Sequence, residues 1–184
     1  PILWLGRPLG SSFPSPNAPR ESENIRLSLG LKGTIIGFDW DFRYTYSKSE
    51  HYIYQPDTST KKFSDAIAGK GGPGGDESWN LFDPSANSYS LVKWISTAQE
   101  TWTKNELDVL DLVFSGDVGS TQQGSIDIAF GLQYREEAFD VKRDKDSIVE
   151  FDSGGNLIKP ADLLFLGGGS ETSANRNAIA LFTE

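Results

Sequence analysis

Every second residue is apolar through residues 125–137, a pattern that recurs along this chain. Side chains of an extended strand alternate between its two faces, so this stretch predicts a strand with one apolar face and one small or polar face. The apolar face would carry Ile126, Ile128, Phe130, Leu132 and Tyr134, and the opposite face Asp127, Ala129, Gly131, Gln133 and Arg135. Such a strand fits the rim of a soluble core. It equally fits a wall with lipid on one side and a wet lumen on the other.

Alternation of apolar and polar residues also predicts strands in four further stretches, residues 23–35, 39–54, 107–118 and 176–184. The cleanest alternation is at 39–54, where one face carries the aromatic residues Trp40, Phe42, Tyr44, Tyr46, Tyr52 and Tyr54. At about 3.3 Å per residue, Trp40 to Tyr52 would span roughly 40 Å, which is close to a bilayer with its interfaces. Aromatic residues at both ends resemble the two girdles of an outer-membrane barrel.

The connections between these strands alternate in length. Long segments are expected before the first strand, at 55–104 and at 146–174, and short turns at 33–38 and 119–124. All nine prolines fall in these connections, as expected because proline cannot donate to a strand ladder. Antiparallel outer-membrane barrels alternate short turns with long loops in this way. A soluble sandwich more usually keeps most of its connections short.

The long connections contain local elements of their own. Within 55–104, Asn87 and Ser88 are cap candidates for a short amphipathic helix, whose apolar stripe would be Leu91, Trp94 or Ile95, Ala98 and Trp102. Within 146–174, residues 148–151 and 157–159 flank a turn at 152–156 and predict a small hairpin. Residues 1–20 are rich in proline and are expected to be loop.

Composition narrows the classes of protein that fit. The 184 residues, 37% of them hydrophobic, are enough for one domain, and no apolar run is long enough for a transmembrane helix. The net charge of -9 argues against nucleic-acid binding. The absence of Cys removes disulfides and thiolate chemistry. The absence of Met and the alternating run at the end predict an interior piece of a longer polypeptide.

Short motifs follow one another along nearly the whole chain. They are Leu-Gly-Leu-Lys-Gly at 29–33, Asp-Trp-Asp at 39–41, Asp-Ala-Ile-Ala-Gly at 65–69, Trp-Asn-Leu-Phe-Asp-Pro at 79–84, Phe-Ser-Gly-Asp at 114–117 and Gly-Leu-Gln-Tyr-Arg-Glu-Glu at 131–137. Together with residues 176–184, these motifs resemble the TonB-dependent outer-membrane receptors. The resemblance implies a 22-stranded barrel occluded by an N-terminal plug. It also implies import of a scarce nutrient, such as a siderophore, cobalamin or oligosaccharide, with energy delivered through TonB.

The plug, the TonB-contacting box and the terminal aromatic strand of that family have no counterpart here, and five strands cannot close a barrel. We therefore expect an all-β fold, an antiparallel transmembrane β-barrel segment of about five strands with long external loops, covering residues 1–184. Such a segment would belong to the wall of a receptor in the cell outer membrane and would not transport by itself. Its partners would be outer-membrane lipid, the rest of the barrel and the plug, TonB through the plug, and a small-molecule or oligosaccharide ligand.

Two sets of residues are candidates for function. The residues expected to face the lumen are Asp39, Asp41, Arg43, Asp127, Gln133, Arg135 and Arg176. Cross-strand pairing that fixes the wall is their default role, with contact to a plug or a passing solute as the alternative. Trp4, Trp79, Trp94 and Trp102 fall in expected loops, where rings pack the loops together or stack on a ligand. Of these, Trp79, Trp94 and Trp102 are the candidate ligand contacts.

We expect neither enzymatic chemistry nor a cofactor. His51, the pair Glu136 and Glu137, and the pair Asp144 and Asp146 are interpreted as solvated charged positions rather than as a metal site or a glycosidase carboxylate pair. The main alternative to the receptor is a soluble secreted or periplasmic β-sandwich that binds carbohydrate through its Trp-bearing loops. A glycoside hydrolase is a third hypothesis.

Overall fold

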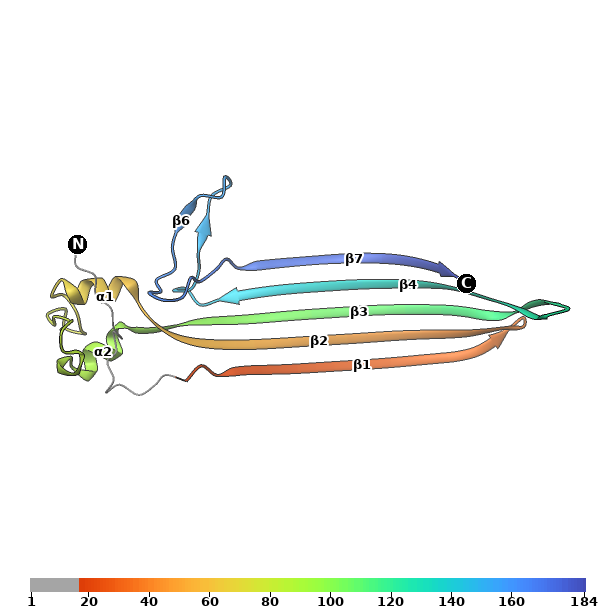
Figure 1. Ribbon diagram of the computed structural model, residues 1–184, viewed down its shortest axis with the longest axis horizontal. Helices are drawn as coiled ribbons and strands as arrows, with labels where there is room; N and C mark the ends of the chain where they lie inside the picture. Colours follow the sequence, from red (N-terminus) through yellow and green to blue (C-terminus); the bar gives the residue numbers. More distant parts are fainter. Residues whose placement is uncertain (1–16) are drawn as a thin grey trace. The chain divides into compact units, whose positions relative to one another are not determined.

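The five predicted strands lie side by side in one sheet, in the order β1-β2-β3-β4-β7 (Figure 1). The computed structural model describes residues 17–184. Its long strands are β1 (Arg20–Ile35), β2 (Phe38–Thr58), β3 (Ser96–Thr121), β4 (Gly124–Arg143) and β7 (Thr172–Thr183). β4 and β7 are antiparallel in unbroken register, from Phe130 opposite Thr183 to Val141 opposite Thr172. The prediction of an all-β, antiparallel fold is confirmed, and β1 and β7 form the edges of this sheet.

Two tight turns connect neighbouring strands. Between β1 and β2 the chain reverses over Ile36 and Gly37, whose φ angles are 50° and 83°. Two successive residues with positive φ are typical of the type I′ hairpin turn, whose twist matches that of the strands it joins. The β3–β4 turn is at 122–123. Both short connections therefore occur where the sequence predicts them.

The strands β2 and β3 extend further into the expected long loop than predicted. Pro56 lies within β2, so the expectation that every proline falls in a connection is wrong for this residue. A proline is tolerated near a strand end, where one missing donor breaks little of the ladder. β3 begins at Ser96, so Ala98 and Trp102 belong to a strand and not to a helix. Backbone pairing extends β3 through a polar stretch that has no regular alternation.

The chain divides into two compact units. The sheet unit consists of Ser22–His51, Thr103–Val141 and Thr172–Glu184. The loop unit consists of Tyr52–Trp102, Lys142–Glu171 and the residues up to Glu21, of which 17–21 are described. Among the described residues, every buried hydrophobic side chain belongs to the loop unit. In the sheet unit only Gly131 is buried. The two units therefore differ in how their apolar residues are used.

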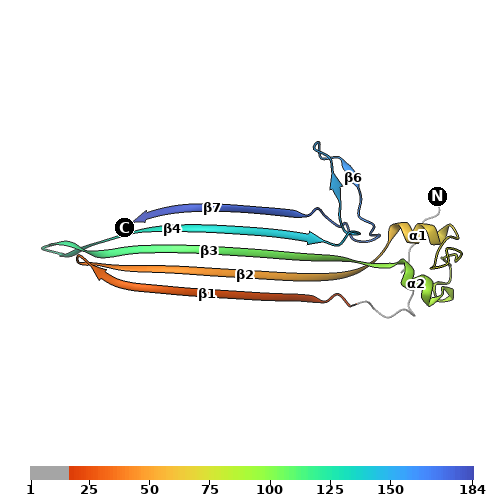
Figure 2. The same cartoon turned by 180° about the vertical axis from the view of Figure 1, so that it is seen from behind.

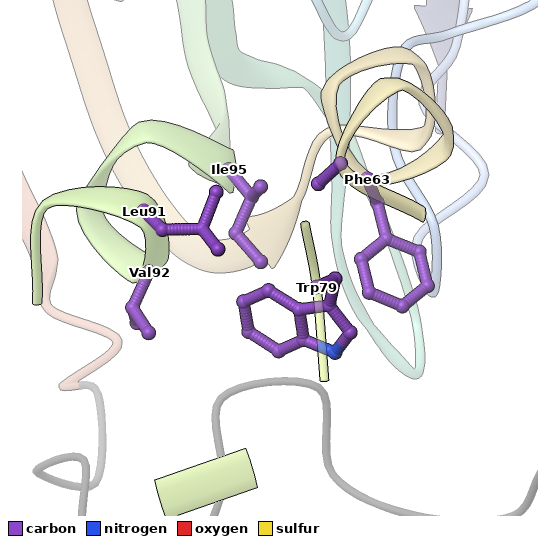
Figure 3. Packing of buried hydrophobic residues seen from close by; sticks show 6 residues of the cluster. Phe63, Trp79, Leu91, Val92 and Ile95 are labelled. Atoms are coloured by element: carbon purple, nitrogen blue, oxygen red, sulfur yellow. The ribbon is translucent and has the colours of Figure 1, made fainter. Parts of the chain in front are cut away.

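Two short helices build the core of the loop unit. In α1 (Thr60–Ile67), the N-cap Ser59 accepts a hydrogen bond from the Lys62 backbone N–H at 3.1 Å, and in α2 (Tyr89–Ile95), Ser88 accepts one from Leu91 at 3.0 Å. The helices enclose a cluster of Phe63, Ala66, Trp79, Leu91, Val92 and Ile95 (Figure 3). A 3-10 turn, η1 (Pro84–Ala86), follows Asp83. The helix α2 is shorter than predicted, and α1 is not predicted, although Phe63 and Ala66 have helical spacing behind Ser59.

Carboxylates join distant segments of the loop unit. Asp57, which is 6% exposed, accepts a hydrogen bond from the Leu166 backbone N–H at 2.8 Å. Asp162 accepts hydrogen bonds from the Ser59 hydroxyl at 2.6 Å and from the Lys61 backbone N–H at 2.8 Å. A carboxylate that receives several N–H and O–H donors makes stronger bonds than a neutral acceptor. These contacts hold the segment around Asp162–Leu166 against the start of α1.

The predicted hairpin is present as β5 (Glu150–Phe151) and β6 (Leu157–Lys159) (Figure 2). In its turn, the Asp152 carboxylate accepts backbone N–H bonds from Gly154 and Asn156, each at 2.8 Å. The Asn156 side-chain amide also donates to Asp152, and this bond is the main reason why the pKa of Asp152 lies below its usual value. The sequence therefore predicts this hairpin and its turn correctly. Among the described residues, neither the length nor the hydrophobicity of any helix reaches that of a membrane-spanning helix.

Candidate functional site

The seven predicted lumen residues lie on one face of the sheet unit, here called the charged face. The β1–β2 register pairs Ser28 with Thr45, whose hydroxyls are 2.9 Å apart, and Thr34 with Asp39, whose oxygens are 2.7 Å apart. In both pairs an even-numbered residue of β1 lies beside an odd-numbered residue of β2. Because side chains alternate along a strand, even-numbered residues of β1 and odd-numbered residues of β2 share this face. The same alternation places Asp127 on the face to which Gln133 of β4 points.

A group of three charges crosses from β1 to β2 on the charged face. Arg43 donates to both oxygens of Asp41, from Nε at 3.0 Å and from Nη2 at 2.8 Å, and the Lys32 ammonium lies 3.2 Å from the same carboxylate. Two parallel bonds from a guanidinium fix its orientation as well as its position. Lys32 and Asp41 thus form an ion pair between β1 and β2, whereas Arg43 pairs with Asp41 along the same strand.

Asp111 continues this network to the next strands. Its carboxylate accepts a hydrogen bond from Gln133 Nε2 of β4 at 2.7 Å, and its charge interacts with that of Arg43 on β2. Asp111 is not among the predicted lumen residues, because Val109 and Val113 share its side of β3 and obscure the alternation. Its position beside Gln133 follows from the register of β3 with β4, which the sequence pattern does not give.

Glu137 links Arg135 and Arg176 at the β4–β7 end of the charged face. Arg135 Nε lies 3.0 Å from its carboxylate, and Arg176 donates a short hydrogen bond from β7. The Arg176 side chain is 72% exposed, so each pair alone contributes little, typically less than about 1 kcal/mol. An open hollow of about 340 Å³ lies beside Glu137 and Arg176, lined also by Phe139 and Ala174.

Glu136 does not share the environment of Glu137. Its carboxylate accepts a hydrogen bond from the Tyr134 hydroxyl at 3.4 Å. Adjacent residues of a strand point to opposite faces, so Glu136 and Glu137 do not form a catalytic pair.

In the part of the chain that the structure describes, side chains on the opposite face of the sheet unit, here called the apolar face, are largely exposed. Aliphatic side chains on this face that are more than 40% exposed range from 41% at Leu132 to 79% at Leu181, and they include Ile25, Leu27, Leu29, Leu31, Ile35, Ile126, Leu132, Ile179 and Leu181. The rings of Phe114 and Phe130 stack with centroids 5.2 Å apart. A soluble monomer rarely exposes so large a contiguous apolar surface.

Polar side chains interrupt the apolar face where Tyr44 and Tyr46 of β2 lie opposite Asp108 and Glu106 of β3. Tyr44 donates to Asp108 at 2.5 Å, and Tyr46 donates to Glu106 at 3.2 Å. The Lys104 ammonium lies 2.9 Å from Glu106. Tyrosine has an apolar body and a polar tip, and such residues are enriched where an apolar surface meets water. The apolar face therefore ends near Tyr46 on β2.

The tryptophan candidates occupy different environments in the loop unit. Trp79 is 6% exposed and contacts Phe63 edge to face, with ring centroids 5.6 Å apart, so it packs the core. Trp94 lies under the Lys62 ammonium, 5.7 Å from its ring centroid. Trp102 is a strand residue that contacts the Tyr52 ring at 5.4 Å, so its predicted position in a loop is wrong. Trp4 lies outside the described residues. The structure does not bring the three candidates together.

The remaining polar candidates have protein partners. Both ring nitrogens of His51 lie 2.8 Å from hydroxyls, of Ser22 and of Ser49. Asp144 accepts hydrogen bonds from the backbone N–H of Glu100 and of Asp146, each at 2.9 Å. Among the residues that the structure describes, no group of three or more acidic, His or Cys side chains is placed to hold a metal ion.

Replacement of Gly131 by Val is expected to weaken the pairing of β4 with β7. Phe182 of β7 lies across Gly131, so a side chain there would overlap its ring and would come 3.0 Å from the Leu112 carbonyl oxygen. Overpacking of this kind costs about 1–3 kcal/mol of unfolding free energy, measurable by denaturant titration. Ala129→Val on the same face is the control and should change stability less. If Phe182→Ala did not restore part of the loss, the packing explanation would fail.

Comparisons of the chain with protein-family models, with curated proteins and with solved structures give no match.

Proposed function

We propose that this chain forms part of the wall of a transmembrane β-barrel in the cell outer membrane, with the apolar face toward lipid and the charged face toward the lumen. The observation that carries the proposal is the exposed apolar face, on which Leu29, Leu31, Ile179 and Leu181 are each at least 60% exposed. Apolar area in water costs about 25 cal/mol per Å². Contact with lipid chains removes this cost, and the paired charges opposite remain in water.

The height of the apolar face along β2 fits a bilayer. On β2 it extends from Phe38 beside the short turn to Tyr46, about nine residues, or roughly 30 Å at 3.3 Å per residue. A strand tilt of about 40° reduces this to roughly 23 Å, which is close to the apolar band of about 25 Å in outer-membrane barrels. The pairs Tyr44–Asp108 and Tyr46–Glu106 would then lie at the membrane–water interface.

Within this class, we propose a TonB-dependent receptor that binds and imports a scarce nutrient. Support comes from the ordered motifs described above and from the alternation of two tight turns with the long connections 59–95 and 144–171. In such a receptor this chain is only wall and external loop. The rest of the barrel, the plug and, through the plug, TonB would supply gating and energy. Nothing in the proposal requires a cofactor or an enzymatic step.

Ligand contact, in this proposal, belongs to exposed residues of the loop unit rather than to Trp79. Phe82 is 96% exposed, so its ring is accessible to a siderophore, a cobalamin or a sugar. Trp94 is partly buried against the core and offers less of its ring. The charged face would meet the plug or a passing solute.

Spin labels placed on alternate residues of β1 test the proposal. These 184 residues contain no Cys, so single cysteines at Leu29 and Leu31, and at Ser28 and Gly30 as matched controls, carry the nitroxides once any Cys elsewhere in the native protein has been replaced by Ser. In the native membrane, labels at 29 and 31 should collide with dissolved oxygen more than with a water-soluble nickel complex, and labels at 28 and 30 should do the reverse. Equal access to nickel at all four positions would contradict a lipid-facing strand. Protection at 29 and 31 from both reagents would indicate the soluble sandwich instead.

A further inference from the structure

The tip of the β1–β2 turn carries a residue that suits neither its backbone conformation nor contact with water. Ile36 has a φ of 50°, and among the described residues it is the only non-glycine residue with a positive φ. A β-branched side chain is strongly disfavoured in this left-handed region, where Asn and Gly are usual. The Ile36 side chain is also 95% exposed. Backbone strain at an exposed apolar residue points to a contact that the sheet itself does not supply.

The apolar face continues as far as this turn. The hydrogen bond between Thr34 and Asp39 on the charged face sets the β1–β2 register, in which Ile35 lies beside Phe38 as the last pair before the turn. Ile35 and Phe38 therefore both belong to the apolar face, and Ile35 is 54% exposed. Residues 33–38 include no charged side chain. No charge thus separates Ile36 from the apolar face.

The position of Ile36 along the strands matches the edge of a bilayer. Only Gly37 separates Ile36 from Phe38, where the apolar face begins on β2, so the tip lies no more than about 7 Å further along the strand direction. Each interfacial layer of a bilayer is about 5–7 Å thick. If the apolar face spans the hydrocarbon, the tip of this turn therefore lies among the lipid headgroups and not in free water.

We propose that Ile36 inserts into the lipid headgroup layer on the side of the membrane where the short turns lie, and that it anchors the β1–β2 hairpin there. The inference rests on the proposed function, because it takes the apolar face to contact lipid. Transfer of an aliphatic side chain out of water is favourable, so lipid contact would offset the strain at Ile36. Lipid is the occupant because the neighbouring pair, Ile35 and Phe38, faces lipid in the proposed barrel wall.

The β3–β4 turn provides an internal contrast. Gly116 of β3 lies beside the β1–β2 turn, where a Cβ atom would come 3.0 Å from the Gly37 carbonyl oxygen. β3 continues to Thr121, so the β3–β4 hairpin extends roughly 16 Å beyond that point (Figure 1). The tip of this hairpin is the polar pair Gln122 and Gln123. We therefore expect one short turn to lie in lipid and the other in water.

Fluorescent labels at the two turns test the inference in the native membrane protein that carries this sequence. Single cysteines, Ile36→Cys and, as the control, Gln122→Cys, are labelled with an environment-sensitive dye after any other Cys has been replaced by Ser. The protein is placed in phosphatidylcholine vesicles that contain a lipid with a nitroxide near its headgroup. Iodide should quench the label at 36 about fivefold less than the label at 122, because a bare ion does not enter the apolar layer. The lipid nitroxide should quench the label at 36 much more strongly than the label at 122.

Two substitutions at Ile36 test the same contact through stability. Leu keeps an aliphatic side chain but removes the β-branch, whereas Asn tolerates the positive φ but is polar. In vesicles, the unfolding equilibrium constant of Ile36→Leu should be about fivefold or more below that of Ile36→Asn, because only Leu retains the lipid contact. At a turn in water the order would reverse, since Asn-Gly is the preferred pair in a type I′ turn.

The outcomes separate this inference from the proposed function. Equal iodide quenching at 36 and 122, with lipid-facing spin labels at 29 and 31, would overturn the inference and leave the barrel wall intact. Protection of the label at 36 from both iodide and the lipid nitroxide would place a protein against the turn and would also overturn it. If Ile36→Cys does not fold, the order of the Leu and Asn variants decides.

Discussion

Replacement of Leu31 by Arg is expected to destabilise the membrane-inserted protein by about 2–4 kcal/mol, the cost of a lipid-facing Arg near the middle of the bilayer. Leu31 is 63% exposed on the apolar face and lies near the middle of the region that we assign to lipid. A charge there loses its water without gaining a partner. Urea titration of the protein refolded in vesicles measures the change.

The matched control for this substitution is Ser28→Arg, on the same strand but on the charged face. It removes a hydrogen bond to Thr45 but places the new charge toward water, so the loss should be below about 1.5 kcal/mol. In a soluble protein that left Leu31 exposed, both substitutions would cost less than about 0.5 kcal/mol. A negligible effect of Leu31→Arg in vesicles would therefore count against the lipid-facing assignment.

Trp79→Ala is expected to cost about 3–5 kcal/mol in the stability of the loop unit, as is typical when a large buried aromatic residue is truncated. Trp79 contacts Phe63 and closes the cluster between α1 and α2 (Figure 3). Loss of its ring leaves a cavity that two helices of eight and seven residues fill poorly. Protease cleavage within residues 60–95, followed over time, reports the local unfolding.

Phe82→Ala separates this structural role from ligand contact. Phe82 is 96% exposed, so its truncation should change stability by less than about 0.5 kcal/mol. If the ring contacts a ligand, uptake by the native protein should fall in Phe82→Ala while protease resistance is unchanged. Normal protease resistance of Trp79→Ala would show that this residue is not part of a structural core.

The strands could be predicted because each depends on residues that are neighbours in the sequence. Alternation in residues 125–137 determines both a strand and its two faces, since side chains of extended backbone alternate whatever the strand pairs with. For the same reason the seven charged or polar candidates could be assigned to one face. The two-residue turn at Ile36 and Gly37 is equally local. Helix α1 was predictable in principle, from Ser59 and the spacing of Phe63 and Ala66.

The partners of those residues could not be predicted, because they depend on how distant segments pair. That Asp111 binds Gln133, and that Glu137 binds both Arg135 and Arg176, depends on the register between strands that lie far apart in sequence. The burial of Trp79 depends on helices that precede and follow it. The extension of β3 to Ser96 follows from backbone pairing, which is independent of side-chain pattern. Alternation between neighbouring residues is therefore enough to predict the strands and their faces, whereas contacts between distant segments determine which side chains bind one another.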